Sequence, residues 1–266
     1  SGISNLRIEI KIYEEISVKA GLDVVIEYHN AFSDEICDEM VERFESDGRA
    51  TRGLSGIYGP DYKGKVNKVS TDLQISMLSE WADMDDRIFN ILTPYVRGYV
   101  DMLSEKFHYE ELNHIKDLGY QIQRTDPGGY FNWHSDFDSQ PLVDQFIQHK
   151  MGNSLICIRE RIATYILYLN DRSEYDDDDG TTEFKFGDDS KIIKAEKGKL
   201  IMFPADPFYP HRGVPLKNGV KYLMTGWVTR DRVSQVTGDP TDYSEREARY
   251  GDTGLSLIHI SEPTRP

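Results

Sequence analysis

One short segment of the chain combines two residue types that bind transition metals. His134 and Asp136 are separated by a single residue in the stretch from Gly128 to Asp136. On a β-strand, residues two apart point to the same face, so this imidazole and this carboxylate would project together. They would supply two of the three ligands in the two-histidine, one-carboxylate triad that leaves positions open on iron. The same pair, taken alone, is also typical of two hydrogen-bonded surface side chains.

A third candidate ligand, His211, lies 211 − 136 = 75 residues further along the chain. It follows a predicted strand that ends at Phe203-Pro204, and it precedes Lys221 by 221 − 211 = 10 residues. Ten residues allow a turn and a returning strand, which would bring the Lys221 ammonium back near the metal. A buried cation beside a metal site requires an anion, and a dicarboxylic co-substrate would supply one.

The elements before this segment are mainly helical. Residues 23–28 are short, apolar and β-branched, which predicts a strand. Ser33 is a candidate N-cap for a helix that ends near Asp47, and a second helical period runs over residues 80–107. Pro94 lies inside that period and should kink or divide the helix. Residues 49–67 are rich in Gly and show no period, so we expect a loop.

From Gly119 onward the pattern changes to short alternating runs joined by Gly, Pro and Asp. These predict strands at residues 120–124, 162–169, 184–186, 199–203 and 222–228. The four carboxylates from Asp176 to Asp179 should form a solvated turn. We therefore predict an α+β, mainly β fold: a double-stranded β-helix (jelly roll) core with N-terminal helices packed outside.

The pattern also suggests a division of the chain. We expect an N-terminal extension (1–22), a single main domain (23–230; helical part about 30–110, jelly-roll core about 119–230), a C-terminal extension (231–254) and a final segment (255–266). Residues 255–265 resemble the translation of a sequencing-library adapter. His259 is therefore not expected to contribute to function.

Composition limits the classes of partner. The formal net charge is −15, and no basic stretch suggests phosphate contacts, so nucleic acid is not expected as a partner. No run of about 18 apolar residues suggests a membrane span. Cys37 and Cys157 are expected to be two buried thiols, which mildly favours a reducing compartment. We expect a soluble, cytoplasmic protein of undetermined oligomeric state.

Five motifs in order resemble the prolyl 4-hydroxylase branch of the Fe(II)/2-oxoglutarate dioxygenases, a branch that includes versions carried by phages. They are Gly129-Tyr130 before His134-x-Asp136, Arg161 to Asn170 ending Tyr168-Leu169-Asn170, Gly180 to Phe184, Gly198 to Pro204, and His211 to Trp227. The resemblance covers roughly Asp23 to Arg230 and is dense from Tyr120 onward.

The resemblance implies a role for several residues. His134, Asp136 and His211 would ligate Fe(II), and Lys221 would pair with the distal carboxylate of 2-oxoglutarate. Tyr168 would donate its hydroxyl to the same carboxylate. Thr225 and Trp227, four and six residues after Lys221, would line the co-substrate pocket. For these last three residues, ordinary core packing is the alternative.

One position departs from the family pattern. Many relatives carry a Tyr on the strand before the Gly-rich turn, where this chain has Gln123 or Arg124. Either side chain can donate hydrogen bonds, but the pocket would differ in shape and charge. Substrate preference therefore does not transfer directly from the family.

The activity implied is hydroxylation of a C–H bond with release of succinate and CO₂. Fe(II), 2-oxoglutarate and O₂ would take part, with ascorbate as a further candidate. A peptide or protein containing proline is the expected substrate. The alternatives are a small molecule such as a free amino acid, and a non-catalytic jelly-roll binding module. Nucleic-acid dealkylation is disfavoured by the acidic charge and by Lys221, where those enzymes tend to use Arg.

Overall fold

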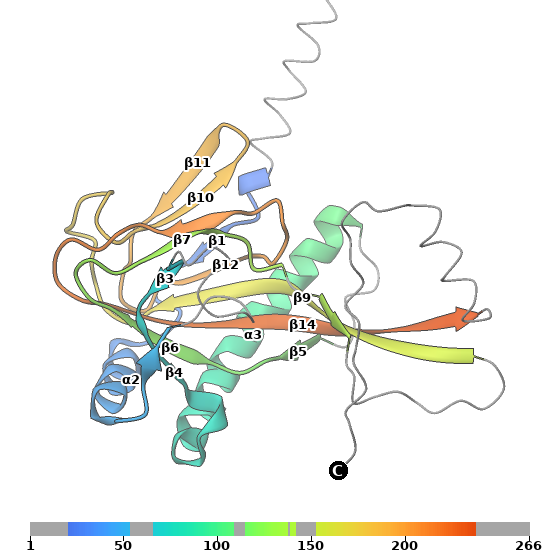
Figure 1. Cartoon of the computed structure of the whole chain (residues 1–266), viewed down its shortest axis with the longest axis horizontal. Helices are drawn as coiled ribbons and strands as arrows, with labels where there is room; N and C mark the ends of the chain where they lie inside the picture. Colours follow the sequence, from blue (N-terminus) through green and yellow to red (C-terminus); the bar gives the residue numbers. More distant parts are fainter. Residues whose placement is uncertain (1–20, 54–65, 109–114, 138, 142–152, 238–266) are drawn as a thin grey trace, which may run out of the picture. The chain divides into compact units, whose positions relative to one another are not determined.

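The computed structural model describes residues 21–53, 66–108, 115–137, 139–141 and 153–237, and Figure 1 shows their arrangement. The chain divides into two compact units, one of residues 1–140 with 159–231 and one of residues 141–158 with 232–266. The candidate site lies wholly in the first unit, to which the following description applies. Most of the predicted N-terminal extension, most of the C-terminal extension and the adapter-like segment lie outside the described residues.

In the described part that follows β1 (Ile26–Tyr28), the helical elements are two α-helices and two single turns of 3₁₀-helix. Helix α2 spans Asp34–Ser46, and helix α3 spans Ala82–Phe107 after the turns Ile75–Met77 and Ser79–Trp81. Pro94 was predicted to kink or divide the helix, and α3 is not divided there. Buried side chains lie on the apolar face of α3 both before and after the proline, from Met84 to Leu103. That packing holds one continuous helix even though proline removes a backbone donor.

The larger sheet forms one wall of the jelly roll, and Figure 1 shows α3 behind its strands β9, β14 and β6. Its main order is β1-β12-β9-β14-β6-β4-β2, with β5 pairing β14 and β8 pairing β9. The strands are β1 (Ile26–Tyr28), β2 (Thr51–Arg52), β4 (Thr71–Gln74), β5 (Ile115–Asp117), β6 (Gln121–Thr125), β8 (Ser139–Pro141), β9 (Asn153–Tyr168), β12 (Leu200–Pro204) and β14 (Lys221–Thr237).

The smaller sheet forms the opposite wall in the order β11-β10-β13-β7-β3. Its strands are β3 (Lys68–Val69), β7 (Tyr130–His134), β10 (Thr182–Phe186), β11 (Asp189–Ile193) and β13 (His211–Gly213). All strand pairs with a recorded register are antiparallel, as a jelly roll requires. The predicted α+β, mainly β jelly roll is confirmed.

Two local features differ from the sequence-based expectation. Short strands β2, β3 and β4 lie within or beside the stretch expected to be a loop, of which residues 54–65 lie outside the described part. In the acidic turn, Asp176 to Asp178 are exposed as predicted, but Asp179 is buried. The prediction was wrong at Asp179 because that carboxylate accepts hydrogen bonds from the neighbouring loop.

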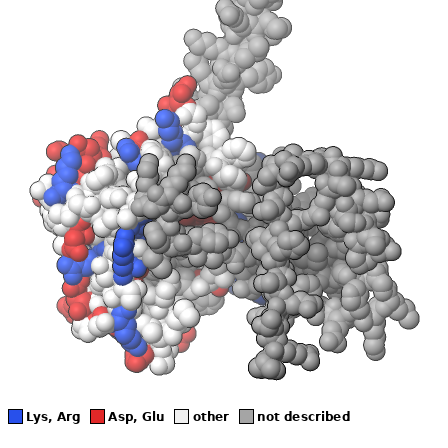
Figure 2. Space-filling view, viewed as in Figure 1, with Lys and Arg blue, Asp and Glu red and all other residues white. Residues whose placement is uncertain are grey.

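The surface carries charges of both signs. On the face shown in Figure 2, Lys and Arg atoms are interspersed with Asp and Glu atoms over the described part. Among the described residues, every helix is too short or too polar to span a bilayer.

Candidate metal centre and co-substrate pocket

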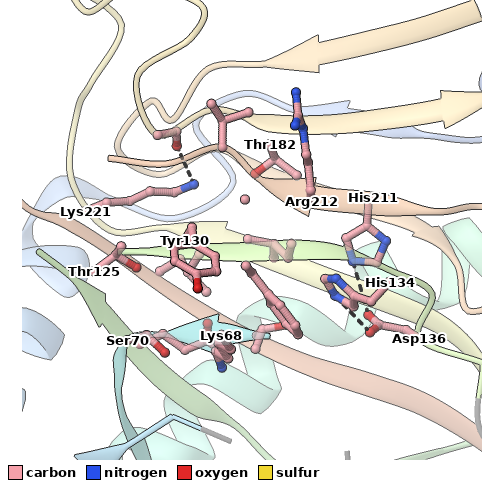
Figure 3. A pocket seen from close by; sticks show the side chains of 18 of the residues that line it. Lys68, Ser70, Thr125, Tyr130, His134, Asp136, Thr182, His211, Arg212 and Lys221 are labelled. Atoms are coloured by element: carbon pink, nitrogen blue, oxygen red, sulfur yellow. Dashed lines mark hydrogen bonds and ion pairs between the residues drawn. The ribbon is translucent and has the colours of Figure 1, made fainter. Parts of the chain in front are cut away.

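The two candidate histidine ligands are cross-strand neighbours in the smaller sheet. His134 is the last residue of β7, His211 is the first residue of β13, and the two pair directly across the antiparallel ladder. Their ring centroids lie 4.2 Å apart. Asp136 follows β7 by two residues and returns its carboxylate to the same point, as Figure 3 shows.

The three side chains form a compact set of donors. His134 Nε2 lies 3.6 Å from Asp136 Oδ1, and His211 Nε2 lies 3.7 Å from Asp136 Oδ2. One ligand atom from each residue falls within 4.8 Å of the others. Burial, together with the nearby His211, lowers the pKa of His134. Neutral imidazoles and an ionised carboxylate are the forms that bind metal.

Both imidazoles are oriented by the same kind of contact. His134 Nδ1 lies 2.7 Å from the Asn132 carbonyl, and His211 Nδ1 lies 3.2 Å from the Tyr209 carbonyl. A proton on Nδ1 would be donated to these carbonyls, which leaves the Nε2 lone pairs free for a metal. The backbone carbonyls that orient the two imidazoles therefore also suit a site for a divalent transition metal.

Aromatic rings hold the two imidazoles in place. Phe131 stacks on His134 with centroids 3.5 Å apart, and Phe184 stacks on His211 at 5.4 Å. Phe203 meets His211 edge-on at 4.7 Å. This packing restricts rotation of both rings, so little ordering is left to be done when a metal binds.

The carboxylate of Asp136 is held from the larger sheet. Thr164 on β9 donates its hydroxyl to Asp136 Oδ2 at 2.8 Å. The indole N–H of Trp227 on β14 is buried, and no described residue lies at ordinary hydrogen-bond distance from it. Its interaction with Asp136 nevertheless favours the ionised carboxylate. Burial alone would raise the pKa of Asp136, but the two histidines, Thr164 and Trp227 outweigh that effect and lower it. Asp136 is therefore ionised.

A cavity between the two sheets connects the triad to Lys221. Its empty space, open mouth included, is about 690 Å³. Figure 3 shows the triad at one end and Lys221 at the other. Lys221 is 5% exposed and donates to the Gly180 carbonyl at 2.6 Å. Among the described residues, no carboxylate forms an ion pair with it.

This arrangement matches a known protein family. Residues 120–229 match the family model described as the 2OG-Fe(II) oxygenase superfamily. The chain carries a 2OG-Fe(II) oxygenase domain. Domains of this family use Fe(II), 2-oxoglutarate and O₂, and the matched segment contains the triad and Lys221. No curated protein matches the sequence.

Solved structures share the fold of the oxygenase domain at low sequence identity. A prolyl 4-hydroxylase from Pseudomonas putida is 13% identical, with a TM-score of 0.51, over 81% of this chain and 98% of that chain. A prolyl hydroxylase from Trichoplax adhaerens, solved with a hypoxia-inducible-factor peptide, is 16% identical, with a TM-score of 0.50, over 83% and 91%. The non-haem α-ketoglutarate-dependent epimerase SnoN is 12% identical, with a TM-score of 0.51, over 94% and 92%.

The oxygenase cavity includes most of the residues predicted from the sequence. Lys221, Thr225 and Trp227 line it together from β14, as the alternation of a strand requires. Thr225 donates its hydroxyl to the Tyr165 carbonyl at 2.9 Å. Gln123 lines the cavity from β6 and donates its side-chain amide to Gln121 at 2.7 Å.

Tyr168 occupies a different place from the cavity-lining residues of the oxygenase. Its side chain is fully buried, and its hydroxyl donates to Thr182 Oγ1 at 2.7 Å. Lys221 Nζ lies 5.4 Å from the centre of its ring. Thr182 itself lines the cavity. In this geometry the hydroxyl presented to the cavity is that of Thr182, supported from behind by Tyr168.

Sequence reasoning missed two ion pairs in the oxygenase wall, of which that of Lys68 is buried and that of Arg212 is partly exposed. Lys68 Nζ lies 2.6 Å from Asp72 Oδ2 and 5.2 Å from the centre of the Phe131 ring that stacks on His134. Arg212 pairs with Glu183 at 2.6 Å. Glu183 lies within the Gly180 to Phe184 motif, but the motif gave it no role, and Lys68 lies outside the motifs. Lys68 and Asp72 are only four residues apart, whereas the pairing of β10 with β13 brings Glu183 to Arg212.

Proposed function

We propose that this oxygenase hydroxylates proline residues in peptides or proteins, using iron held by His134, Asp136 and His211 and 2-oxoglutarate held by Lys221. The observation that carries the proposal is that one cavity has a three-residue donor set at one end and, at the other, a buried lysine that has no carboxylate partner among the described residues. The family match supports the general reaction. The assignment of individual residues and of the substrate is our own.

The bound iron, 2-oxoglutarate and O₂ would together supply the oxidising power, with succinate and CO₂ released and one oxygen atom inserted into the substrate C–H bond. The protein contributes position and electrostatics. The Asn132 and Tyr209 carbonyls keep both imidazoles in one tautomer, and Thr164 fixes the carboxylate. Contacts of this kind commonly change metal affinity by about 10- to 100-fold.

Lys221 would hold the co-substrate by its distal carboxylate. Burial, followed by the charge of Arg172, lowers the pKa of Lys221 to about 7. An incoming carboxylate would favour the charged form and gain a short, charge-assisted hydrogen bond. The hydroxyl of Thr182, beside Lys221 in Figure 3, is placed to donate to the same carboxylate. Together they would set the distance between the co-substrate and the metal end of the cavity.

A peptide substrate is favoured by side chains next to the triad. Trp133 and Phe137, which flank the ligands in sequence, are 40% and 55% exposed. Arg212 lies over the Trp133 ring at 4.9 Å. Neither side chain lines the cavity, but exposed aromatic groups that flank the ligands in sequence suit contact with an extended, proline-containing peptide. The similar folds of the Pseudomonas and Trichoplax prolyl hydroxylases agree with this choice.

A small-molecule substrate is the second candidate. The fold is equally similar to that of the epimerase SnoN from nogalamycin biosynthesis. Lys68 and Arg212, which line the cavity, could orient a polar small molecule as well as a peptide. A non-catalytic binding module is disfavoured, since such a module has no need for a complete triad together with Lys221.

The decisive test is turnover with defined peptides. Proline-rich peptides are incubated with the protein, Fe(II), 2-oxoglutarate and O₂, and mass spectrometry measures the gain of one oxygen together with succinate. We expect both, in equal amounts. Succinate formation without oxygen gain on any peptide would reject the peptidyl-proline substrate while keeping the oxygenase. Absence of both would reject the proposed reaction.

A further inference from the structure

Lys221 rests on a turn that is anchored by one buried carboxylate. Its ammonium donates to the Gly180 carbonyl, and Gly180 directly follows Asp179. Asp179 is 4% exposed, whereas the three carboxylates before it are exposed. One member of the acidic run therefore has an environment quite unlike that of its neighbours.

The Asp179 carboxylate ties the turn to the loop before β14. Its Oδ1 accepts from the Lys217 backbone N–H at 2.8 Å, and its Oδ2 accepts from Asn218 Nδ2 at 2.9 Å. Oδ1 also accepts from the Arg172 guanidinium at 3.0 Å. Burial would raise the pKa of Asp179, but these bonds and the Arg172 charge lower it. The anchor is therefore a charged one.

The backbone conformation of Gly180 is restricted. Its φ is +69°, a left-handed value that favours glycine. A Cβ atom there would lie 2.3 Å from Leu216 Cδ1. The direction of the Gly180 carbonyl, and hence the position of the Lys221 ammonium, depends on how the turn is held against residues 215–218.

Arg172 supplies the second link between Asp179 and Lys221. It is 4% exposed, packs over Tyr175 with its Cζ 4.0 Å from the ring centre, and is the charged group that acts on the pKa of Lys221. Asp179 lies beside it and offsets that charge. A buried ion pair that loses one member leaves the other uncompensated.

Other titratable groups lie against Lys221 or across the cavity from it. Tyr168 lies against it from β9, and burial raises the pKa of that phenol, which keeps it neutral. Across the cavity, Lys68 is paired with Asp72 and Arg212 with Glu183, and the triad lies at the far end. Among the described residues, Arg172 is the charged group that acts on the pKa of Lys221, and Asp179 is paired with it at 3.0 Å.

We propose that Asp179 is a positioning residue for Lys221, and that it sets how tightly the oxygenase binds the distal carboxylate of 2-oxoglutarate. It acts through the Gly180 carbonyl and by offsetting the charge of Arg172. The inference rests on the proposed role of Lys221. It assigns a function to a carboxylate that touches neither the metal site nor the co-substrate.

The direction of the effect follows from the charges. The co-substrate pairs with the ammonium form of Lys221, so its affinity falls as pH rises and that form is lost. When Asp179 is neutralised, Arg172 opposes protonation of Lys221 more strongly, and the fall occurs at lower pH. When Arg172 is neutralised instead, Asp179 favours protonation, and the fall occurs at higher pH.

The test measures 2-oxoglutarate affinity against pH. Calorimetry with the Mn(II)-loaded protein from about pH 6 to about pH 9 compares wild type with Asp179→Asn, Arg172→Gln and the double variant. We expect Asp179→Asn to weaken binding roughly tenfold at pH 8 and to move the fall in affinity down by about one pH unit, since one unit corresponds to a tenfold change. Arg172→Gln should move it up, and the double variant should return it toward wild type.

Asp178→Asn is the matched control, because it removes the same charge from an exposed neighbour whose partner is the Lys217 side chain. It should change the affinity by less than twofold. The inference is overturned if the profiles of folded Asp179→Asn and Arg172→Gln both coincide with wild type, or if both move in the same direction. If Asp179→Asn does not fold, Arg172→Gln alone decides by the sign of its shift. Lys221→Met separates the two proposals: unchanged affinity in that variant would reject the role of Lys221 itself.

Discussion

His134 and His211 face each other directly across two neighbouring antiparallel strands, although 77 residues (211 − 134) separate them in the chain. The ladder between β7 and β13 brings their ring centroids within 4.2 Å. A hydrogen-bonded strand pair is a rigid support, so the two Nε2 atoms are placed before any ion binds. The geometry of the candidate metal site therefore depends on the sheet, with Asp136 supplied by the residues that follow β7.

Removal of one ligand should abolish metal-dependent chemistry. His211→Ala leaves two of three donors, so we expect loss of the visible charge-transfer band that Fe(II) and 2-oxoglutarate give under anaerobic conditions, and succinate formation reduced by at least about 100-fold. His29→Ala is the matched control, because His29 is exposed and lies outside the cavity. An unchanged band in His211→Ala would show that the ligand assignment is wrong.

Lys221→Met should weaken co-substrate binding without harming the fold. The change removes one charge-assisted hydrogen bond, worth about 1.5–3 kcal/mol, so the 2-oxoglutarate dissociation constant should rise roughly 10- to 100-fold. The metal-free variant should unfold at the same temperature as wild type or higher, because a buried charge is gone. Lys217→Met, at an exposed lysine four residues earlier, serves as control. Equal dissociation constants for the two variants would contradict the assignment.

The stability of the metal-free protein should depend on pH through Lys221. Its pKa is about 7 in the folded protein, below the ordinary value of 10.5. Between these values the unfolded chain binds the extra proton, so the Lys221 contribution to stability increases as pH rises from about 7 to about 10. The gain in melting temperature from Lys221→Met should thus be larger at pH 7 than at pH 10. A gain that is constant over this range would speak against a depressed pKa.

Thr164→Val should loosen the metal site while preserving the core. The two side chains have similar shape, but valine cannot donate to Asp136, so we expect iron affinity to fall by about tenfold or more. Thr229→Val is the control, because Thr229 is equally buried and donates to the Lys116 carbonyl away from the cavity. Iron titration of the two variants gives the comparison. Identical affinities would mean that the hydroxyl of Thr164 has no part in holding the carboxylate.

Gly198→Ala should destabilise the fold by more than about 1 kcal/mol. Gly198 has φ +77°, and a Cβ atom would lie 2.3 Å from the Phe32 backbone oxygen. Strain and collision therefore act together. Gly48→Ala is the control, since nothing lies within 4 Å of a Cβ at that position. A lower melting temperature for Gly48→Ala than for Gly198→Ala would refute the explanation.

Features that depend on local spacing along the chain were predictable from the sequence. Alternation on a strand put Lys221, Thr225 and Trp227 on one face, and the motif order predicted the jelly roll and the triad residues. These features can be recognised in the sequence because side-chain direction along a strand has a period of two.

Contacts between strands and turns could be identified only in the tertiary structure. Asp179 looked like one more solvated carboxylate, and Tyr168 looked like a cavity residue. Burial of Asp179 depends on residues 215–218, and the hydroxyl of Tyr168 turns to Thr182 because β10 lies across from it. Such partners are set by long-range packing, where hydrogen bonds unavailable to the isolated segment compensate the cost of burying a charge.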